Sequence, residues 1–254
     1  MIVNVGYATW SDVCLDGTRF NDVRWFTTID STNRYLLEAA REGAPEGTVA
    51  VADEQTAGRG RLGRSWIAPP GASLLVSTLV RPALAPEALS LVTMAAGLAC
   101  IAAVRELGGI EAGLKWPNDV VVDDRKLAGI LAEKDADAVV VGMGCNVLWD
   151  TFPAELASIA TACNRCTDRV ITREQLLAAW LVAFDARLAA LHRVIDEAIA
   201  ESATLGQRVR VEMPNGSYEA DAVSLTAHGH LVVRTDDGTE TAISSADVIH
   251  LRTA

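Results

Sequence analysis

The stretch TVAVADEQTAGRGRLGRSWIAPPGASLLVSTLV, residues 48–80, contains two apolar runs on either side of a glycine-rich segment. The runs at 48–52 and 72–80 are short and rich in apolar and β-branched side chains, as strands are. The pattern therefore predicts two strands that bracket a long loop.

The loop concentrates positive charge. Within residues 55–66 three arginines alternate with three glycines and no acidic residue is present, although the chain has a formal net charge of −11. Glycines let backbone N–H groups approach a ligand, and arginines bind carboxylate or phosphate oxygens, so we expect an anionic ligand here. Trp66 offers a flat face to a purine. Alone, the loop also fits RNA binding or a solvated surface loop, but its spacing does not match a P-loop.

The segments on either side of this loop predict an α+β fold. A β-rich run at 23–29 ends at the helix-capping residues 30–33, and apolar residues at helical spacing follow. Further helices are predicted at 87–107 and 173–191, and a meander of short strands at 120–122, 127–133 and 138–142. We expect a mixed β-sheet flanked by helices.

The end of the chain has a different pattern. From residue 205 onward, five short alternating segments are separated by Asn-Gly, His-Gly and Asp-Gly turns, which predicts a small β-barrel. We therefore expect two units that pack together: a domain at 1–204, with its core at 23–150, and a small barrel domain at 205–254.

Composition and cysteine usage exclude several classes of protein. The acidic charge disfavours binding to nucleic acid or an anionic membrane. Residues 1–21 lack the pattern of a secretory signal, and residues 89–104 are an uncharged run too short to cross a bilayer, so we expect a cytoplasmic protein with a buried helix there. Five cysteines predict no disulfide framework, and the CxxC pair Cys163 and Cys166 lacks partner histidines at metal-binding spacing, so no metal site is predicted.

Two further segments could carry chemistry. Lys115-Trp116-Pro117-Asn118-Asp119 is followed seven residues later by Lys126, and the proline indicates a bend at a strand end where polar side chains converge. An ordinary turn in which Asp119 caps local amides is the alternative. The segment Gly142-Met143-Gly144-Cys145-Asn146 has the glycines of a close approach and ends in an amide, although paired glycines also mark bulges.

Taken in order, DSTN (30–33), QTAGRGRLGRSW (55–66), KWPND (115–119), KLAGILAE (126–133) and GMGCN (142–146) resemble the biotin protein ligase family. The resemblance spans about residues 23–146. It implies the class II synthetase-like fold of biotin and lipoate ligases, followed by a small SH3-like C-terminal β-barrel. It also implies ATP-dependent formation of biotinyl-5′-AMP and transfer of biotin to a lysine of a carrier domain of an acyl-CoA or pyruvate carboxylase.

The resemblance implies a role for each matching residue. Lys126, Asp119 and Arg59 would be catalytic. Biotin would contact Ser31, Thr32, Asn33, Gln55, Arg59, Gly60, Arg61, Lys126, Leu127 and Gly129. ATP and the adenylate, with Mg²⁺ accompanying ATP, would contact Arg59, Arg61, Arg64, Trp66, Asn118, Lys126 and Asn146.

The same resemblance leaves alternatives. About 22 residues precede the matching region, so we expect no DNA-binding repressor domain, and we expect a monomer or a homodimer. A lipoate or octanoyl transferase or ligase is the nearest rival, which the complete GRGRLGRSW and KWPND segments disfavour. A non-catalytic module that binds biotinyl-adenylate or a partner protein is a second rival, which the presence of Arg59, Arg61, Asp119 and Lys126 together disfavours.

Overall fold

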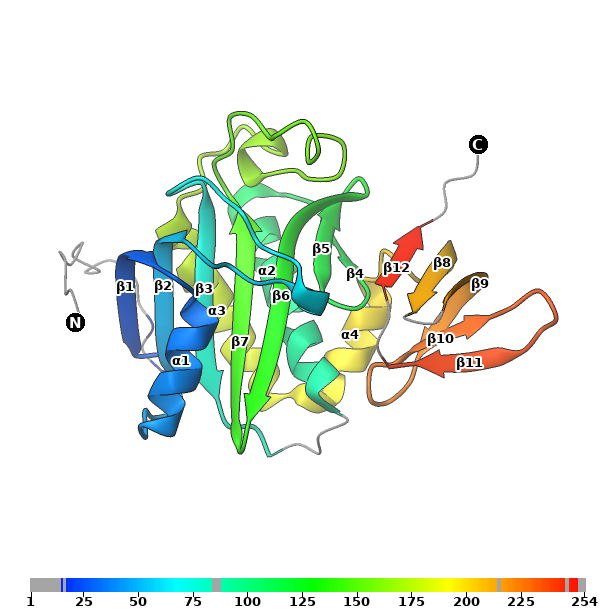
Figure 1. Cartoon of the computed structure of the whole chain (residues 1–254), viewed down its shortest axis with the longest axis horizontal. Helices are drawn as coiled ribbons and strands as arrows, with labels where there is room; N and C mark the ends of the chain where they lie inside the picture. The colour runs from blue at the N-terminus through cyan, green and yellow to red at the C-terminus, as the bar shows by residue number, and fades with distance from the viewer. Residues whose placement is uncertain (1–14, 16, 84–87, 214–215, 245–246, 251–254) are drawn as a thin grey trace.

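A computed structural model describes residues 15, 17–83, 88–213, 216–244 and 247–250, and the described chain is built around a seven-stranded sheet (Figure 1). The strands follow one another across the sheet in the order β1-β2-β3-β7-β6-β5-β4. Only the β1 and β2 pair is parallel. Their bounds are β1 Asp22–Ile29, β2 Thr48–Gln55, β3 Ser73–Val80, β4 Gly113–Lys115, β5 Asp119–Val122, β6 Arg125–Asp135 and β7 Ala138–Asn146. The predicted mixed sheet is confirmed.

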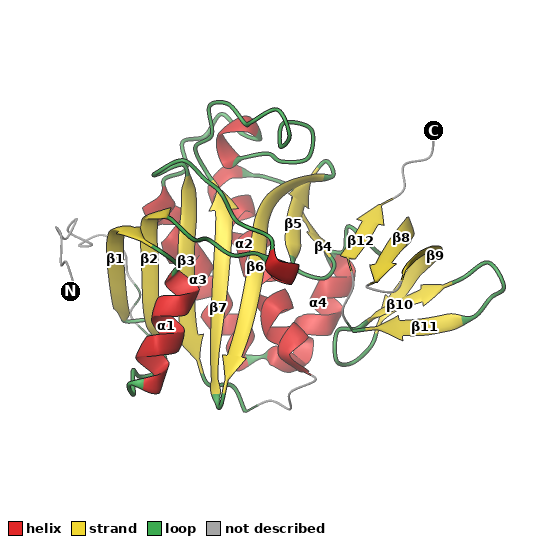
Figure 2. Cartoon of the chain, in the orientation of Figure 1, coloured by secondary structure: helices red, strands yellow, loops and turns green. Residues whose placement is uncertain are grey.

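Helices cover both faces of this sheet (Figure 2). Helix α1, Thr32–Arg41, packs on β2, β3 and β7, and its N-cap Ser31 accepts a hydrogen bond from the Arg34 backbone N–H. The other face carries α2, Leu89–Gly108, and α3, Arg173–Ala189, while α4, Val194–Ala200, packs beside α2. Every residue of β3 is buried, because this central strand has helices on both of its faces.

Helix α2 is apolar because it lies inside the molecule. By length and composition alone it could cross a membrane, but 72% of its most apolar window is buried. Trp180 of α3 donates its indole N–H to the Ala96 carbonyl of α2 at 3.0 Å and stacks on Phe184. The prediction of a buried helix is confirmed, and α2 with α3 forms most of the core behind the sheet.

The C-terminal residues form a second, smaller antiparallel sheet. Its strands are β8 Arg208–Met213, β9 Gly216–Leu225, β10 Leu231–Arg234, β11 Glu240–Ile243 and β12 Asp247–His250, in the order β11-β10-β9-β8-β12. The five predicted strands are present. In the described part of the chain no pairing joins the edge strands β11 and β12, so the sheet is open there and closure into a barrel is not confirmed.

The small sheet is fastened to the end of the large one (Figure 1). The backbone N–H of Leu114 in β4 donates to the Glu201 carbonyl at 2.7 Å, and the N–H of Ala203 donates back to the Leu114 carbonyl at 2.9 Å. Trp116 donates its indole N–H to the Gly229 carbonyl at 3.0 Å. Strand β4 is therefore bonded to the segment that leads into the small sheet, and Trp116 to the turn between β9 and β10.

Candidate functional site

A cavity of about 600 Å³ lies between the arginine loop, residues 56–66, and strands β5, β6 and β7. Its wall includes thirteen residues that were predicted as ligand contacts, which come from five separate segments: Ser31, Thr32, Asn33, Gln55, Arg59, Gly60, Arg61, Arg64, Trp66, Asn118, Lys126, Gly129 and Asn146. Asp119 also lines it. The structure thus brings the motif residues into one site.

Leu127 is the one predicted contact that does not line the cavity. Val120 pairs with Ala128 and Val121 pairs with Lys126, so Leu127 is an extra residue in β6, a β-bulge. A regular strand would place Leu127 on the same face as Gly129. The bulge reverses this alternation, so that Lys126 takes the cavity face and Leu127 is fully buried in the core.

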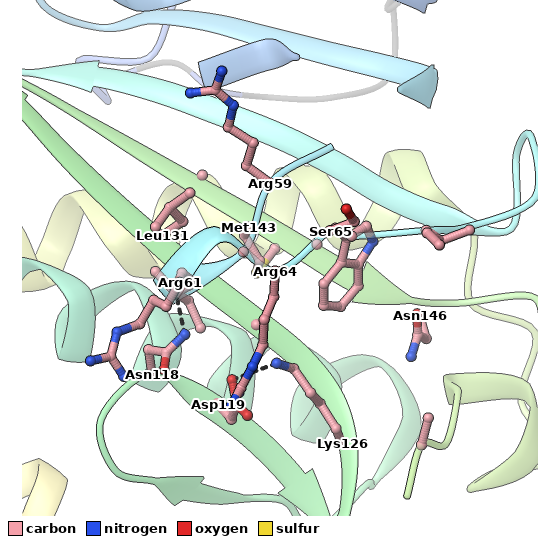
Figure 3. A pocket seen from close by; sticks show the side chains of 18 of the residues that line it. Arg59, Arg61, Arg64, Ser65, Asn118, Asp119, Lys126, Leu131, Met143 and Asn146 are labelled. Carbon is pink, nitrogen blue, oxygen red and sulfur yellow. Dashed lines mark hydrogen bonds and ion pairs between the residues drawn. The ribbon is translucent and has the colours of Figure 1, made fainter. Parts of the chain in front are cut away.

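The charged centre of the site is an ion pair. The ammonium nitrogen of Lys126 lies 2.7 Å from Asp119 Oδ1 and 5.5 Å from the ring centre of Trp66. The Arg64 side chain extends toward this pair (Figure 3). The backbone of Lys126 is held by the segment at 159–161, because its N–H donates to the Ile159 carbonyl and its carbonyl accepts from the Thr161 N–H. A cation and a carboxylate are therefore fixed against an aromatic face in one wall of the cavity.

The arginine loop forms an ordered cover on the cavity. Arg59 and Ser65 pair as an antiparallel bridge, and the Gly60 N–H donates to the Arg64 carbonyl at 2.7 Å. Arg61 donates to the Asn118 side-chain oxygen at 3.2 Å, which links the loop to the turn between β4 and β5. A second cavity, about 860 Å³, lies on the other side of the same loop.

Arg59 does not join the charged centre. In Figure 3 its side chain points away from Lys126 and Asp119, whereas Arg61 and Arg64 point toward Asn118 and Asp119. Arg59 lines both cavities, as do its loop neighbours Gly60 and Arg61. The structure therefore places Arg64 nearer the ion pair than the arginine that the sequence predicted to be catalytic.

The glycines of β7 seat two side chains of the site. A Cβ atom added to Gly144 would lie 2.5 Å from the Trp66 ring, and one added to Gly142 would overlap Asn33. The spacing of these glycines predicts the close approach of a ligand. In the structure they are room for Trp66 and Asn33, which pack directly on the strand.

Asn146 at the end of β7 is held in place by two neighbours. Its side-chain nitrogen donates to the Thr161 carbonyl at 3.0 Å, and its oxygen accepts from Ser73 at 3.1 Å. Residues 147–160 contribute an apolar wall, although the segment has no helical or strand periodicity that would predict it. It is formed by Trp149, Phe152, Leu156, Ile159 and Ala160.

The four cysteines that the structure describes show no catalytic arrangement. Hydrogen bonds with the thiols of Cys100 and Cys163, and burial as well, raise the pKa of Cys145 well above its ordinary value, so it stays a neutral thiol. Cys166 lies beside the Thr161 hydroxyl at 3.4 Å. Over the residues that the structure describes, no group of three or more His, Cys, Asp or Glu side chains could hold a metal ion.

Comparison with known proteins identifies relatives over nearly the whole chain. Residues 25–150 match the model of the biotin/lipoate A/B protein ligase family, and residues 204–251 match that of the biotin protein ligase C-terminal domain. A biotin–acetyl-CoA-carboxylase ligase of Mycobacterium tuberculosis is 40% identical over 238 residues, which cover 87% of this chain and 86% of that protein. The bifunctional ligase/repressor BirA of Bacillus subtilis is 33% identical over 234 residues, which cover 87% of this chain and 71% of that protein.

The fold has close relatives among solved structures. The biotin protein ligase from Aquifex aeolicus in complex with biotin and ATP superposes with a TM-score of 0.80 at 29% identity, over 92% of this chain and all of that one. The biotin protein ligase from Leishmania major in complex with biotinyl-5-AMP superposes with a TM-score of 0.64 at 28% identity, over 88% of this chain and 99% of that one.

Proposed function

Because the chain belongs to the biotin protein ligase family, we propose that it activates biotin with ATP and transfers the biotinyl group to a lysine of a biotin carboxyl carrier domain. AMP and pyrophosphate are the leaving products. The single observation that carries the proposal is the Lys126 and Asp119 ion pair, 2.7 Å long, beside Trp66 in a cavity whose wall also has a polar end formed by Ser31, Thr32, Asn33 and Gln55.

The first half-reaction brings two anions together. A carboxylate oxygen of biotin attacks the α-phosphorus of ATP, a new P–O bond forms, and the bond to the β-phosphate oxygen breaks with release of pyrophosphate. Lys126 offsets the repulsion between the carboxylate and the phosphate, and Arg61 and Arg64 of the covering loop add positive charge. Preorganised cations in a site that excludes water stabilise the transition state and protect the mixed anhydride from hydrolysis.

The nucleotide would lie at the Trp66 end of the cavity. The indole ring is fixed on the backbone of Gly144, so it presents a rigid face on which adenine stacks. Asn118 and Asn146 supply amide groups for the ribose and phosphates. Mg²⁺ would enter with ATP and be held mainly by the phosphate oxygens, since the described residues contain no group of three or more side chains that could hold a metal ion. Asp119 in the cavity wall would add a carboxylate ligand.

The second half-reaction needs a neutral amine. The acceptor lysine attacks the acyl carbon of biotinyl-5′-AMP, an amide bond forms, and the bond from the acyl carbon to the phosphate oxygen breaks to release AMP. Asp119 is the group that orients the amine and receives its proton. Its ion pair with Lys126 keeps the carboxylate in place until the acceptor arrives.

The assignment of biotin over lipoate or octanoate rests on the polar end of the cavity. Gln55 Oε1 accepts from both the backbone N–H and the hydroxyl of Thr32, at 2.7 and 3.0 Å, so the head of the ligand meets a built hydrogen-bonding site. Biotin carries a ureido group that uses such a site, whereas the dithiolane of lipoate and the methyl end of octanoate do not.

We extend the proposal to the organisation of the protein. The catalytic unit would end near residue 204, and the C-terminal unit would close into an SH3-like barrel that contributes Glu212 and Val248 to the cavity wall. We place the enzyme in the cytoplasm, and its acidic net charge supports a protein that binds neither nucleic acid nor an anionic membrane. A monomer or a homodimer would serve this chemistry.

The test is biotin-dependent exchange of labelled pyrophosphate into ATP in the presence of Mg²⁺, run beside lipoate and octanoate. Exchange with biotin alone is expected. Exchange only with lipoate or octanoate would move the chain to the sister activity, and a folded protein without exchange would refute adenylate formation. Transfer is then measured as attachment of labelled biotin to a purified carrier domain, with its acceptor lysine replaced by arginine as the control.

A further inference from the structure

Behind the polar end of the cavity lies a hydrogen-bonded chain that begins at Glu133 of β6. The side-chain nitrogen of Asn33 donates to Glu133 Oε2 at 2.7 Å and to the Leu131 carbonyl at 3.2 Å. A carboxylate and a carbonyl are acceptors only, so the amide nitrogen of Asn33 must face them. Both of its donors are then used, and Asn33 Oδ1 has to face the other way.

Ser77 of β3 continues the chain. Its hydroxyl lies 2.6 Å from Asn33 Oδ1 and 2.7 Å from the Thr32 hydroxyl. Because Asn33 Oδ1 is an acceptor, the single proton of Ser77 points to it. The Thr32 proton must then point to Ser77 or to Gln55 Oε1, which lies 3.0 Å away. In either case Thr32 keeps only acceptor capacity for a ligand.

Gln55, in contrast to Thr32, is left with a hydrogen-bond donor for a ligand. Its oxygen is occupied by the backbone N–H of Thr32 at 2.7 Å, so its side-chain nitrogen is the group left to face a ligand. The polar end of the cavity therefore presents an acceptor, Thr32, beside a donor, Gln55. The directions of the Asn33 and Ser77 protons follow from the acceptors at the far end of the chain, the Glu133 carboxylate and the Leu131 carbonyl, while Gln55 is oriented by the Thr32 backbone N–H.

We propose that Glu133 and Ser77 are positioning residues that set this donor and acceptor pattern and so select a cyclic urea, whose N–H and C=O groups lie side by side. The inference rests on the proposed function and names the residues that give it its substrate preference. Glu133 does not line the ligand cavity, whereas Ser77 lies in its wall. Glu133 acts through Asn33, and Ser77 acts through Asn33 and Thr32.

The packing around these hydrogen-bonded residues supports one orientation of the Asn33 amide. Asn33, Thr32 and Ser77 are 5%, 3% and 0% exposed, so water cannot replace a lost partner easily. Gly142 completes the arrangement, since any larger side chain there would overlap Asn33. The orientation is therefore enforced by both hydrogen bonding and shape.

The experiment measures the KM for biotin and the KM for ATP in pyrophosphate exchange. Glu133→Met and Ser77→Ala are expected to raise the KM for biotin about 10-fold or more, because the Asn33 amide or the Thr32 hydroxyl is free to reverse. The KM for ATP should stay within about 3-fold, since the nucleotide binds at the other end. Glu133→Gln should keep the KM for biotin within about 3-fold of the unsubstituted enzyme, since its amide oxygen still accepts from Asn33.

Two matched controls are available. Asp135→Ala changes another acidic residue of β6, whose ion pair with Arg41 is at the surface, and it should leave both KM values unchanged. Thr78→Val removes the neighbouring buried hydroxyl of β3, which has no hydrogen-bond partner among the described residues and does not line the cavity. The double variant of Ser77→Ala and Glu133→Met should lose less than the product of the single losses, because both act on one orientation.

The outcomes separate the two proposals. If the unsubstituted protein does not exchange pyrophosphate with biotin, the proposed function fails and this inference fails with it. If it does, but Glu133→Met and Ser77→Ala leave the KM for biotin unchanged, only the inference is overturned. It is overturned as well if Glu133→Gln is as impaired as Glu133→Met, or if the KM values for biotin and ATP rise together with a fall in melting temperature.

Discussion

Removal of the Lys126 ammonium should abolish adenylate formation while the fold survives. In a Lys126→Ala protein the 2.7 Å ion pair to Asp119 is lost, but the two side chains are 36% and 26% exposed, and such a pair contributes about 0–1 kcal/mol to stability. The contact with the Trp66 ring, 5.5 Å to its centre, adds about 0.5–1 kcal/mol. We expect the substitution to lower the free energy of unfolding by about 1 kcal/mol, which corresponds to a fall of ~2–4 °C in melting temperature.

The loss of activity should be far larger. Removing one preorganised donor from a developing oxyanion slows the chemical step about 10²–10³-fold. Lys126→Ala should therefore lower the rate of biotin-dependent pyrophosphate exchange by at least that factor at saturating biotin and ATP. Lys134→Ala, an exposed lysine of the same strand, is the matched control and should retain full exchange.

The assay compares exchange rates and melting temperatures of the three proteins. A Lys126→Ala protein that exchanges within about 5-fold of the unsubstituted enzyme would contradict the assigned role of the ammonium. A fall in melting temperature above ~10 °C would show instead that the reasoning on stability is wrong, because the lost contacts are too exposed to contribute so much.

Three further predictions concern other parts of the site. Gly144→Ala would push its new methyl group into the Trp66 ring and should raise the KM for ATP about 10-fold with less effect on the KM for biotin; an unchanged KM for ATP would refute the stacking role of the indole. Trp116→Phe removes the buried hydrogen bond to Gly229 and should lower the free energy of unfolding by about 1–3 kcal/mol in urea denaturation, whereas a loss below ~0.5 kcal/mol would mean that this bond does not fasten the C-terminal sheet. Burial, and next the charge of Lys115, lower the pKa of His250 from 6.5, although Asp124 opposes the shift, so the folded protein resists protonation there. The contribution of this group to the free energy of unfolding is therefore full above pH 6.5 and declines as the pH falls below that value. His250→Gln should make the free energy of unfolding less dependent on pH in that range. If the variant shows the same pH dependence as the unsubstituted protein, the assignment is contradicted.

Local sequence was sufficient for much of the fold. The apolar run at 73–80 is fully buried as β3, and the capping residue before α1 starts that helix as its sequence predicts. These features depend on neighbours within a few positions along the chain, which is the range over which periodicity and capping act. The motif residues could be recognised for the same reason, because each motif is a short continuous run whose residue types and spacing are visible in the sequence.

The register in which the strands pair could not be predicted from local sequence. The alternation of residues 127–133 alone would place Leu127 with Gly129 on the cavity face. The bulge against β5 reverses that order and turns Lys126 to the cavity, a result that depends on how Val120 and Val121 pair with another strand. The small sheet is a second example. Its five strands were predictable from the sequence, but the lack of pairing between the edge strands β11 and β12 in the described residues was not.

The sequence by itself determined which chemical groups this protein has: the arginine loop, the lysine and aspartate of the ion pair, and the strands that carry them. Only the tertiary structure decided which of these groups meet. Ser77 and Glu133 lie 44 and 100 residues from Asn33, and neither was predicted as a ligand contact, yet both hydrogen-bond to its amide. The physical reason is that hydrogen-bond direction and side-chain packing are properties of the assembled sheet, because each depends on partners that approach only when distant strands have paired.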